Sequence, residues 1–233
     1  MMSIATNHCY QELVRELSEK YRNRDEAVMA LLHGRQGEKI RERARDMSRR
    51  LTGCLTDADF SRCDLSAKTA SVVKCGGYSI ENVTIQALEG YWLPLNVYVP
   101  EDKAAVHPAV LVCVGHWPAG KWHRENQMLC AGLARNGFIV AIFDPVSQGE
   151  RAAFTPQEQR ECFGDITPDM LSVNMHMLPG NLAYLLGKDV ASLFTWEGMR
   201  VVDYLVSRDD VDAARIGVTG QSGGGTQCLY VAA

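Results

Sequence analysis

The sequence lacks the features that would direct a protein to a membrane or a nucleic acid. No apolar run approaches the roughly 20 residues of a membrane-spanning helix, and the stretch from Met1 to His8 has no apolar core of a secretory signal. The formal net charge is only −4 at pH 7, which gives no reason to expect a polyanionic partner. We therefore expect a soluble, cytoplasmic protein that binds neither membranes nor nucleic acids, with export through a leader outside this sequence left open.

Pairing patterns are also missing among the cysteines. The chain has 8 cysteines, none in a C-x-x-C pair and none at the Cys/His spacing of a zinc site. The sequence therefore predicts no metal site and no redox pair. Cys113 falls in an apolar strand and Cys130 on an apolar helix face, so we expect both thiols to be buried as small hydrophobic groups.

The N-terminal part of the chain has the periodicity of helices. Apolar residues recur at helical spacing through residues 8–51, where Asp25 is predicted to cap a second helix and Gly34 and Gly37 to end it. Basic and acidic residues are interleaved on the other face of the last helix, which is typical of a solvated surface. We expect residues 1–66 to form a helical segment.

The periodicity then changes to that of strands. Val83 and Ile85 alternate with the polar Asn82 and Thr84, which indicates an antiparallel sheet with one solvated face at the edge of the fold. The strands expected in this part are Thr69–Cys75, Tyr78–Leu88 and Leu93–Val99.

Strands and helices alternate in the rest of the chain, which predicts an α/β domain over residues 67–233 with a parallel sheet. The expected elements are strand Ala109–Val114, helix Trp122–Asn136, strand Phe138–Phe143, helix Asp189–Ser207 and a buried strand within Val211–Thr219. The long segment 144–188, rich in Gly, Pro and Met, is more typical of a cap or binding loop than of filler.

One motif near the end of the chain carries chemistry. Gly220, Ser222 and Gly224 match G-x-S-x-G after a predicted strand and before a predicted helix. In this pattern a serine occupies a sharp strand-to-helix turn and exposes its Oγ, and its glycine neighbours leave room for the crowded backbone. The sequence therefore predicts Ser222 as a nucleophile.

A serine nucleophile also needs amide donors for an oxyanion. The N–H of Gly223, directly after the serine, is the first predicted donor. The second is expected from the loop that follows the strand ending at Val114, and we predict Trp117 because Pro118 has no N–H.

The same loop permits a second interpretation, a nucleotide-binding module. Gly115–Lys121 matches G-x-x-x-x-G-K, and Asp144 ends an apolar strand where an acid could hold magnesium. Trp122 stands where the motif requires Ser or Thr, and Pro118 removes an amide from the phosphate cradle.

The histidines do not complete a catalytic triad. His116 and His123 flank the predicted oxyanion loop and are candidates to line the pocket, whereas His176 is interpreted as a packing or surface residue. In hydrolases of the G-x-S-x-G type the acid and then the histidine follow the serine. The eleven residues after Ser222 contain neither.

Three stretches together carry a family resemblance: Val114–Lys121, Phe143–Arg151 and Arg215–Thr226. With them the chain, from Ser79 onward, resembles the α/β-hydrolase superfamily, and within it the acetyl xylan esterase-like and dienelactone hydrolase-like serine esterases. The resemblance implies a three-layer α/β-hydrolase sandwich with a mostly parallel sheet, truncated after the nucleophile elbow and preceded by the helical segment.

The resemblance also implies an activity, namely hydrolysis of small-molecule or carbohydrate esters, above all acetyl esters, through an acyl-enzyme without metal or cofactor. By position, Ser222 is the nucleophile, Gly223 and Trp117 supply the backbone donors, and Gln148 and Gly149 shape the loop beside the site. Because the acid and the base would follow residue 233, we expect this chain alone to be nearly inactive. The remaining alternative is a non-catalytic piece of a hydrolase fold.

Overall fold

The computed structural model describes residues 4–52, 60–102, 104–165 and 173–233. The chain divides into two compact units, Met1–Met47 and Ser48–Ala233. The division falls before the predicted boundary at residue 66. Residues just after it already bond within the larger unit: Ser48 Oγ donates to Tyr230 O (3.5 Å), and Leu65 O accepts from the Gln86 N–H (2.7 Å).

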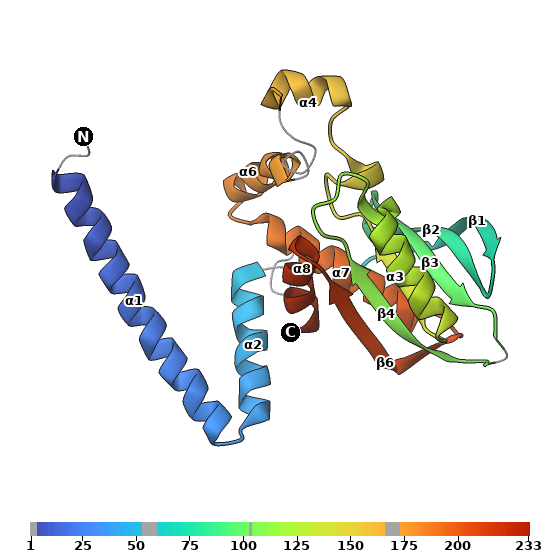
Figure 1. Ribbon diagram of the computed structural model, residues 1–233, viewed down its shortest axis with the longest axis horizontal. Helices are drawn as coiled ribbons and strands as arrows, with labels where there is room; N and C mark the ends of the chain where they lie inside the picture. Colours follow the sequence, from blue (N-terminus) through green and yellow to red (C-terminus); the bar gives the residue numbers. More distant parts are fainter. Residues whose placement is uncertain (1–3, 53–59, 103, 166–172) are drawn as a thin grey trace. The chain divides into compact units, whose positions relative to one another are not determined.

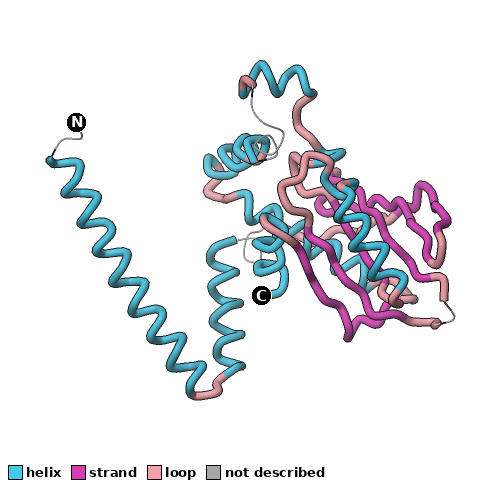
Figure 2. Tube along the Cα trace, viewed as in Figure 1, coloured by secondary structure: helices cyan, strands magenta, loops and turns pink. Residues whose placement is uncertain are grey.

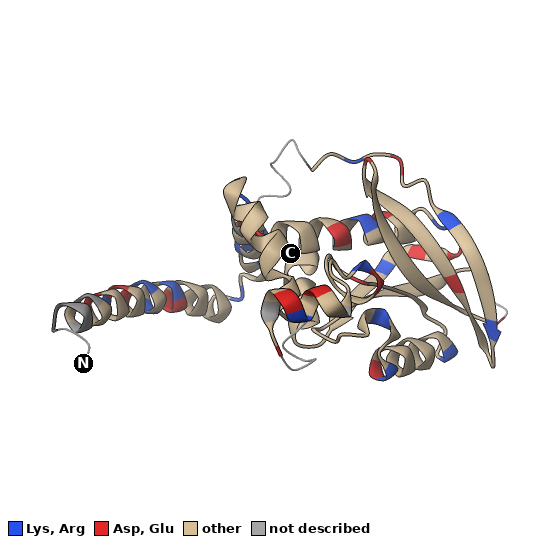
Figure 3. Ribbon diagram, turned by 90° about the horizontal axis from the view of Figure 1, so that it is seen from above, with Lys and Arg blue, Asp and Glu red and all other residues tan. Residues whose placement is uncertain are grey.

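Two helices account for the N-terminal part: α1 (Ile4–His33) and α2 (Gly37–Thr52). The cap predicted at Asp25 is wrong, because α1 runs through it without interruption. Nothing in the sequence between residues 22 and 33 is a glycine or proline that would stop a helix. The break at Gly34 is confirmed and is followed by Arg35 with φ 51°. Basic and acidic residues alternate along α1 (Figure 3), as the Lys20–Glu16 pair illustrates (2.7 Å).

The larger unit is built on a six-stranded mixed sheet in the order β1-β2-β3-β5-β4-β6. β1, β2, β3 and β5 pair antiparallel, whereas β4 pairs parallel with both β5 and β6. The α/β class is therefore confirmed, but the sheet is mixed rather than mostly parallel. The strands are β1 (Lys68–Cys75), β2 (Tyr78–Leu88), β3 (Tyr91–Pro100), β4 (His107–Cys113), β5 (Ile139–Phe143) and β6 (Val211–Gly220).

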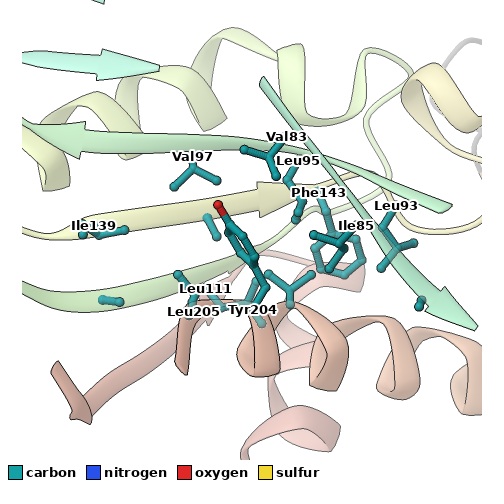
Figure 4. Packing of buried hydrophobic residues seen from close by; sticks show 14 of the residues in the cluster. Val83, Ile85, Leu93, Leu95, Val97, Leu111, Ile139, Phe143, Tyr204 and Leu205 are labelled. Atoms are coloured by element: carbon teal, nitrogen blue, oxygen red, sulfur yellow. The ribbon is translucent and has the colours of Figure 1, made fainter. Parts of the chain in front are cut away.

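Helices cover both faces of this sheet, which confirms the three layers (Figures 1 and 2). On one face, Leu111 and Phe143 pack with Tyr204 and Leu205 of α7 (Figure 4). On the other face, Val112 and neighbouring residues of β3 and β5 pack against α3. The helical elements of this unit are η1 (Gly120–Trp122), α3 (Arg124–Arg135), η2 (Gly149–Arg151), α4 (Pro156–Phe163), α6 (Met177–Leu185), α7 (Val190–Val206) and α8 (Gly223–Ala232).

The strands differ in burial according to their place in the sheet. Val83 and Ile85 of β2 are 2% and 0% exposed, while Asn82 and Thr84 are half-buried, so the predicted alternation is confirmed. The prediction of a buried final strand is wrong. After Val211, the residues of β6 are half-buried or exposed, because β6 ends the sheet that the described residues form and pairs there with β4.

The segment between β5 and α7 contains η2, α4 and α6 in its described parts; residues 166–172, which include the predicted loop residues Pro168 and Met170, lie outside the described residues. Thr155 caps α4 in a reciprocal arrangement with Glu158, whose backbone N–H donates to the Thr155 hydroxyl. None of the helices in the described ranges combines the length and hydropathy needed to cross a lipid bilayer.

Candidate active site

Ser222 occupies the turn between β6 and α8 in a conformation that few L-residues adopt. Its φ and ψ are 56° and −123°, and the residue is exposed. The flanking glycines are required sterically. A Cβ on Gly220 would lie 2.6 Å from the Gly224 carbonyl oxygen and 2.7 Å from that of Cys113. The backbone strain at Ser222 is thus imposed by a strand and a helix that approach too closely for any side chain beside it.

The loop after β4 passes directly against this serine. A Cβ on Gly115 would lie 2.6 Å from Gln221 O and 3.5 Å from Ser222 Cβ. The Trp117 N–H, predicted as the second oxyanion donor, donates to Gly115 O (2.7 Å) in this structure. Among the described residues, the His116 N–H has no backbone acceptor, and neither do the N–H groups of Gly115 and Ala119. Gly223, the first predicted donor, begins α8, where no preceding helical turn supplies an acceptor.

Two histidines meet beside the serine. The His116 ring lies against the backbone of Gly223, where an added Cβ would be 2.5 Å from His116 Nδ1. His116 Nε2 and His176 Nδ1 are 3.1 Å apart, and the His176 ring packs edge-on against Phe194. The interpretation of His176 as a packing residue is therefore incomplete: it is 8% exposed, and its ring bonds His116 of the loop after β4 and the backbone of Val146.

Burial determines the charge of this pair. It lowers the pKa of His116, and burial together with the nearby His116 lowers the pKa of His176 from 6.5 to about 4. Both imidazoles are therefore expected to be neutral at pH 7, so the hydrogen bond between them joins one N–H and one ring lone pair.

The low pKa of His176 predicts a loss of stability in mild acid. Between pH 6.5 and 4 the unfolded chain binds a proton that the folded chain excludes, so this contribution is complete above pH 6.5 and disappears as the pH falls toward 4. We expect the free energy of unfolding to drop by about 2–3 kcal/mol over this window. The measurement is urea unfolding at pH 7.5 and 4.5, followed by tryptophan fluorescence.

A His176→Gln variant should lose most of this pH dependence, whereas the exposed His33→Gln should retain it. Carboxylates with lowered pKa, such as Asp210 beside Arg208, act below this window. An unchanged slope in His176→Gln would show that other groups set the acid response.

Gln148 binds the backbone of the loop that follows β4. Its side chain is 2% exposed, and its Nε2 donates to the carbonyl oxygens of Gly115 and Trp117, the second at 3.0 Å. Gln148 and Gly149 line a cavity of about 50 Å³, which has room for a water molecule rather than a substrate. Gln148 thus bonds the loop after β4, whereas Gly149 lies against the Asp144 carboxylate, and His116 is the candidate that lies against Gly223.

The loop that resembles a phosphate cradle binds an anion of the protein itself. Asp144 Oδ1 accepts the Lys121 N–H (2.6 Å), and Asp144 Oδ2 accepts the Lys121 amine (2.8 Å). The amine also bonds Glu150. A Cβ on Gly120, which has φ 55°, would lie 2.8 Å from Asp144 Cγ. Lys121 and Gly120 therefore surround the Asp144 carboxylate, so neither they nor Asp144 are left to bind a phosphate or magnesium. This argues against the nucleotide-binding interpretation.

A second buried charge network was not predicted. Glu197 of α7 is 0% exposed and accepts hydrogen bonds from Arg151 Nη1 (2.7 Å), the Tyr91 hydroxyl and the Val146 N–H (3.2 Å). Burial, and then the Glu197 charge, raise the pKa of Tyr91, which stays protonated as a donor. This network fixes the segment that carries Gln148. Among the described residues, no three His, Cys, Asp or Glu side chains gather in a way that would hold a metal ion.

Comparison with solved structures identifies the fold. A proposed acetyl xylan esterase from Bacteroides fragilis superposes with a TM-score of 0.63 at 17% identity, over 83% of this chain and 49% of that one. The chain has the α/β-hydrolase fold. A methylesterase superposes with a TM-score of 0.58 at 24% identity, over 81% of this chain and 37% of that one. No family model and no curated protein matches the chain.

The chain thus spans half or less of the length of these two structures. In an α/β-hydrolase fold the nucleophile lies on a sharp strand-to-helix turn that exposes its hydroxyl at the top of the sheet. Ser222 follows β6 at the same edge where the loop after β4 begins, since Cys113 pairs with Gly220.

Proposed function

We propose that this protein is a serine carboxylic-ester hydrolase that acts on carbohydrate esters, with acetyl esters as the main class. The observation that carries the proposal is the conformation of Ser222, with φ 56° in a strand-to-helix turn closed by two glycines. Such strain is retained where the surrounding structure enforces it, and it clusters at functional sites. The similar structures described as an acetyl xylan esterase and a methylesterase support the choice of ester substrates.

In the proposed reaction, Ser222 Oγ attacks the ester carbonyl carbon and the alcohol departs, which leaves an acyl-enzyme that water then hydrolyses. The Gly223 N–H and an amide of the 115–117 loop receive the oxyanion. Trp117 is the proposed second donor, which requires its bond to Gly115 O to open, and the His116 N–H, which has no backbone acceptor among the described residues, is the alternative donor.

The general base is proposed to lie outside residues 1–233. His116 and His176 bond to each other, and burial lowers the pKa of both, so neither is tuned for proton transfer near pH 7. On this proposal the 233-residue chain hydrolyses esters only slowly, through the residual effect of the elbow and its amide donors.

A fluorophosphonate probe tests the proposal, because it phosphonylates an activated serine, and labelling is expected to be slow in the 233-residue chain, which lacks the proposed base. We expect mass spectrometry to locate the label at Ser222 in preference to other serines, and we expect Ser222→Ala to remove it. Ser207→Ala, at an exposed serine after α7, serves as the control and should leave labelling unchanged.

Labelling that persists in Ser222→Ala, or that spreads evenly over exposed serines, would reject Ser222 as the nucleophile. The alternative of a non-catalytic hydrolase-fold piece predicts no labelling at Ser222.

A further inference from the structure

A hollow in the antiparallel part of the sheet has no role in the arrangement described so far. It has a volume of about 380 Å³ and lies between β1, β2 and β3 on one side and η1 and η2 on the other. This volume is within the usual range of small-ligand sites. Its polar wall includes Asn82 and Asn96, and Trp122 and Glu150 line it from the opposite loops.

The polar wall is a row of side chains that crosses three strands. Ser71, Asn82 and Asn96 stand directly opposite one another in the strand register. Asn82 Nδ2 donates to Ser71 Oγ (2.8 Å), and Asn96 Nδ2 donates to Asn82 Oδ1. The row ends at Asn96, which is 9% exposed. Its Oδ1 is buried and has no hydrogen-bond partner in the described residues. A buried acceptor without a donor costs about 1–3 kcal/mol, so this atom points to a ligand that brings a hydroxyl or N–H.

The aromatic wall is Trp122, whose side chain is 54% exposed at the rim. An indole ring beside polar groups offers an apolar face to a flat C–H surface, while amides supply both donors and acceptors. This combination fits a sugar ring, which has C–H groups on its faces and hydroxyl groups at its edge.

The charges in the hollow exclude an anion. Lys121 is the one cation among the ten lining residues, and both Asp144 and Glu150 bind its amine. Glu150 keeps about a third of its side chain exposed and adds a negative charge with room to accept a further hydrogen bond. A phosphate or carboxylate ligand would be repelled by the Glu150 charge and would find no unpaired cation among the lining residues to offset it. A neutral polyol would not be repelled.

The hollow lies at the same edge of the sheet as Ser222. Leu95, in its wall, pairs with Phe143, the last residue of β5. One loop connects the two places: Gly115 touches Ser222 and Gln221, and six residues later Lys121 lines the hollow. We propose that the hollow is a saccharide subsite, which holds one sugar unit of the carbohydrate whose ester group reaches Ser222. The link to ester hydrolysis rests on the proposed function.

The test is a titration of the Ser222→Ala chain with xylotetraose, followed by two-dimensional ¹H–¹⁵N NMR. We expect the side-chain amide signals of Asn82 and Asn96 to shift with saturation, and Trp122→Ala to weaken binding about tenfold, the equivalent of about 1.4 kcal/mol. Trp122→Phe should restore most of the affinity. Trp92→Ala, at an exposed tryptophan on β3, the strand that carries Asn96, but outside the hollow, should leave the affinity unchanged.

Absence of any shift at millimolar saccharide, or binding that Trp122→Ala leaves intact, would overturn the subsite. The result is separable from the fate of the proposed function. Labelling of Ser222 without saccharide binding rejects the subsite alone, and saccharide binding without labelling of Ser222 rejects the hydrolase proposal alone.

Discussion

Replacing Asp144 with alanine is expected to destabilise the larger unit by about 3–5 kcal/mol, the usual cost of removing one partner from a buried ion pair. Asp144 is 0% exposed and accepts hydrogen bonds from the amide and the amine of Lys121 and from the Glu150 N–H (3.2 Å). Without it, the buried Lys121 amine keeps only Glu150, whose side chain is 33% exposed, as a partner, and two backbone amides lose their acceptor. All 4 tryptophans lie in residues 48–233, so tryptophan fluorescence during urea unfolding measures this unit.

An exposed ion pair provides the control for Asp144→Ala. Glu101 pairs with Lys74 at 3.2 Å, with side chains 37% and 74% exposed, and Glu101→Ala is expected to cost less than about 1 kcal/mol. The double variant Lys121→Met with Asp144→Ala should cost less than the sum of the two single changes, because it leaves no buried unpaired charge. Equal effects of Asp144→Ala and Glu101→Ala would contradict the assignment of Asp144 as the anion that organises the loop.

Replacing Gly224 with alanine is expected to destabilise the fold by about 3 kcal/mol or more, because the added methyl group meets backbone rather than a mobile side chain. A Cβ at this position would lie 2.8 Å from Cys113 C and 3.0 Å from Val114 C. To accommodate it, α8 must move away from β4, which also displaces Ser222. Urea unfolding measures the loss of stability, and fluorophosphonate labelling should fall in parallel.

The adjacent glycine gives a matched control. A Cβ on Gly225 would come no nearer than 3.6 Å to Gly220 O, an ordinary contact. Because alanine favours a helix interior over glycine, Gly225→Ala is expected to be neutral or to stabilise by up to about 1 kcal/mol. If both substitutions had the same effect, close packing of β4 against the elbow would not be the reason for the glycine at 224.

Much of the fold was predictable because its local patterns agree with its burial. The alternation in β2 and the continuous apolar runs of β4 and β5 each reflect the number of faces that are covered. β6 was misjudged for a tertiary reason. Its sequence is typical of a buried strand, but the residues of a strand do not show how many other strands lie beside it.

The site was predictable where it depends on backbone, and less so where it depends on contacts between distant residues. The glycines around Ser222 carried a local signal, whereas the contact of His116 with His176 joins residues 60 positions apart. The burial of Glu197 was predictable from the sequence, because Glu197 lies four residues from both Leu193 and Val201 on the apolar stripe of α7. A charged residue on such a stripe indicates a buried ion pair.

The G-x-x-x-x-G-K match was informative about structure and misleading about function. Its glycine and lysine do surround an anion, as that pattern predicts, but the anion is the Asp144 carboxylate. Sequence distinguishes these cases poorly, because a carboxylate from the next strand and a bound phosphate require the same amides and the same small residues.

The edge position of β6 has a mechanical consequence for catalysis. Among the described strands, β4 is the one that pairs with the strand that delivers Ser222, through a ladder from Ala109–Ile216 to Cys113–Gly220. The opposite margin of β6 ends the described sheet, and another strand can add to an edge of this kind. Any such addition would stiffen the support of the serine, so the alignment of the hydroxyl with its amide donors is coupled to whatever occupies that margin.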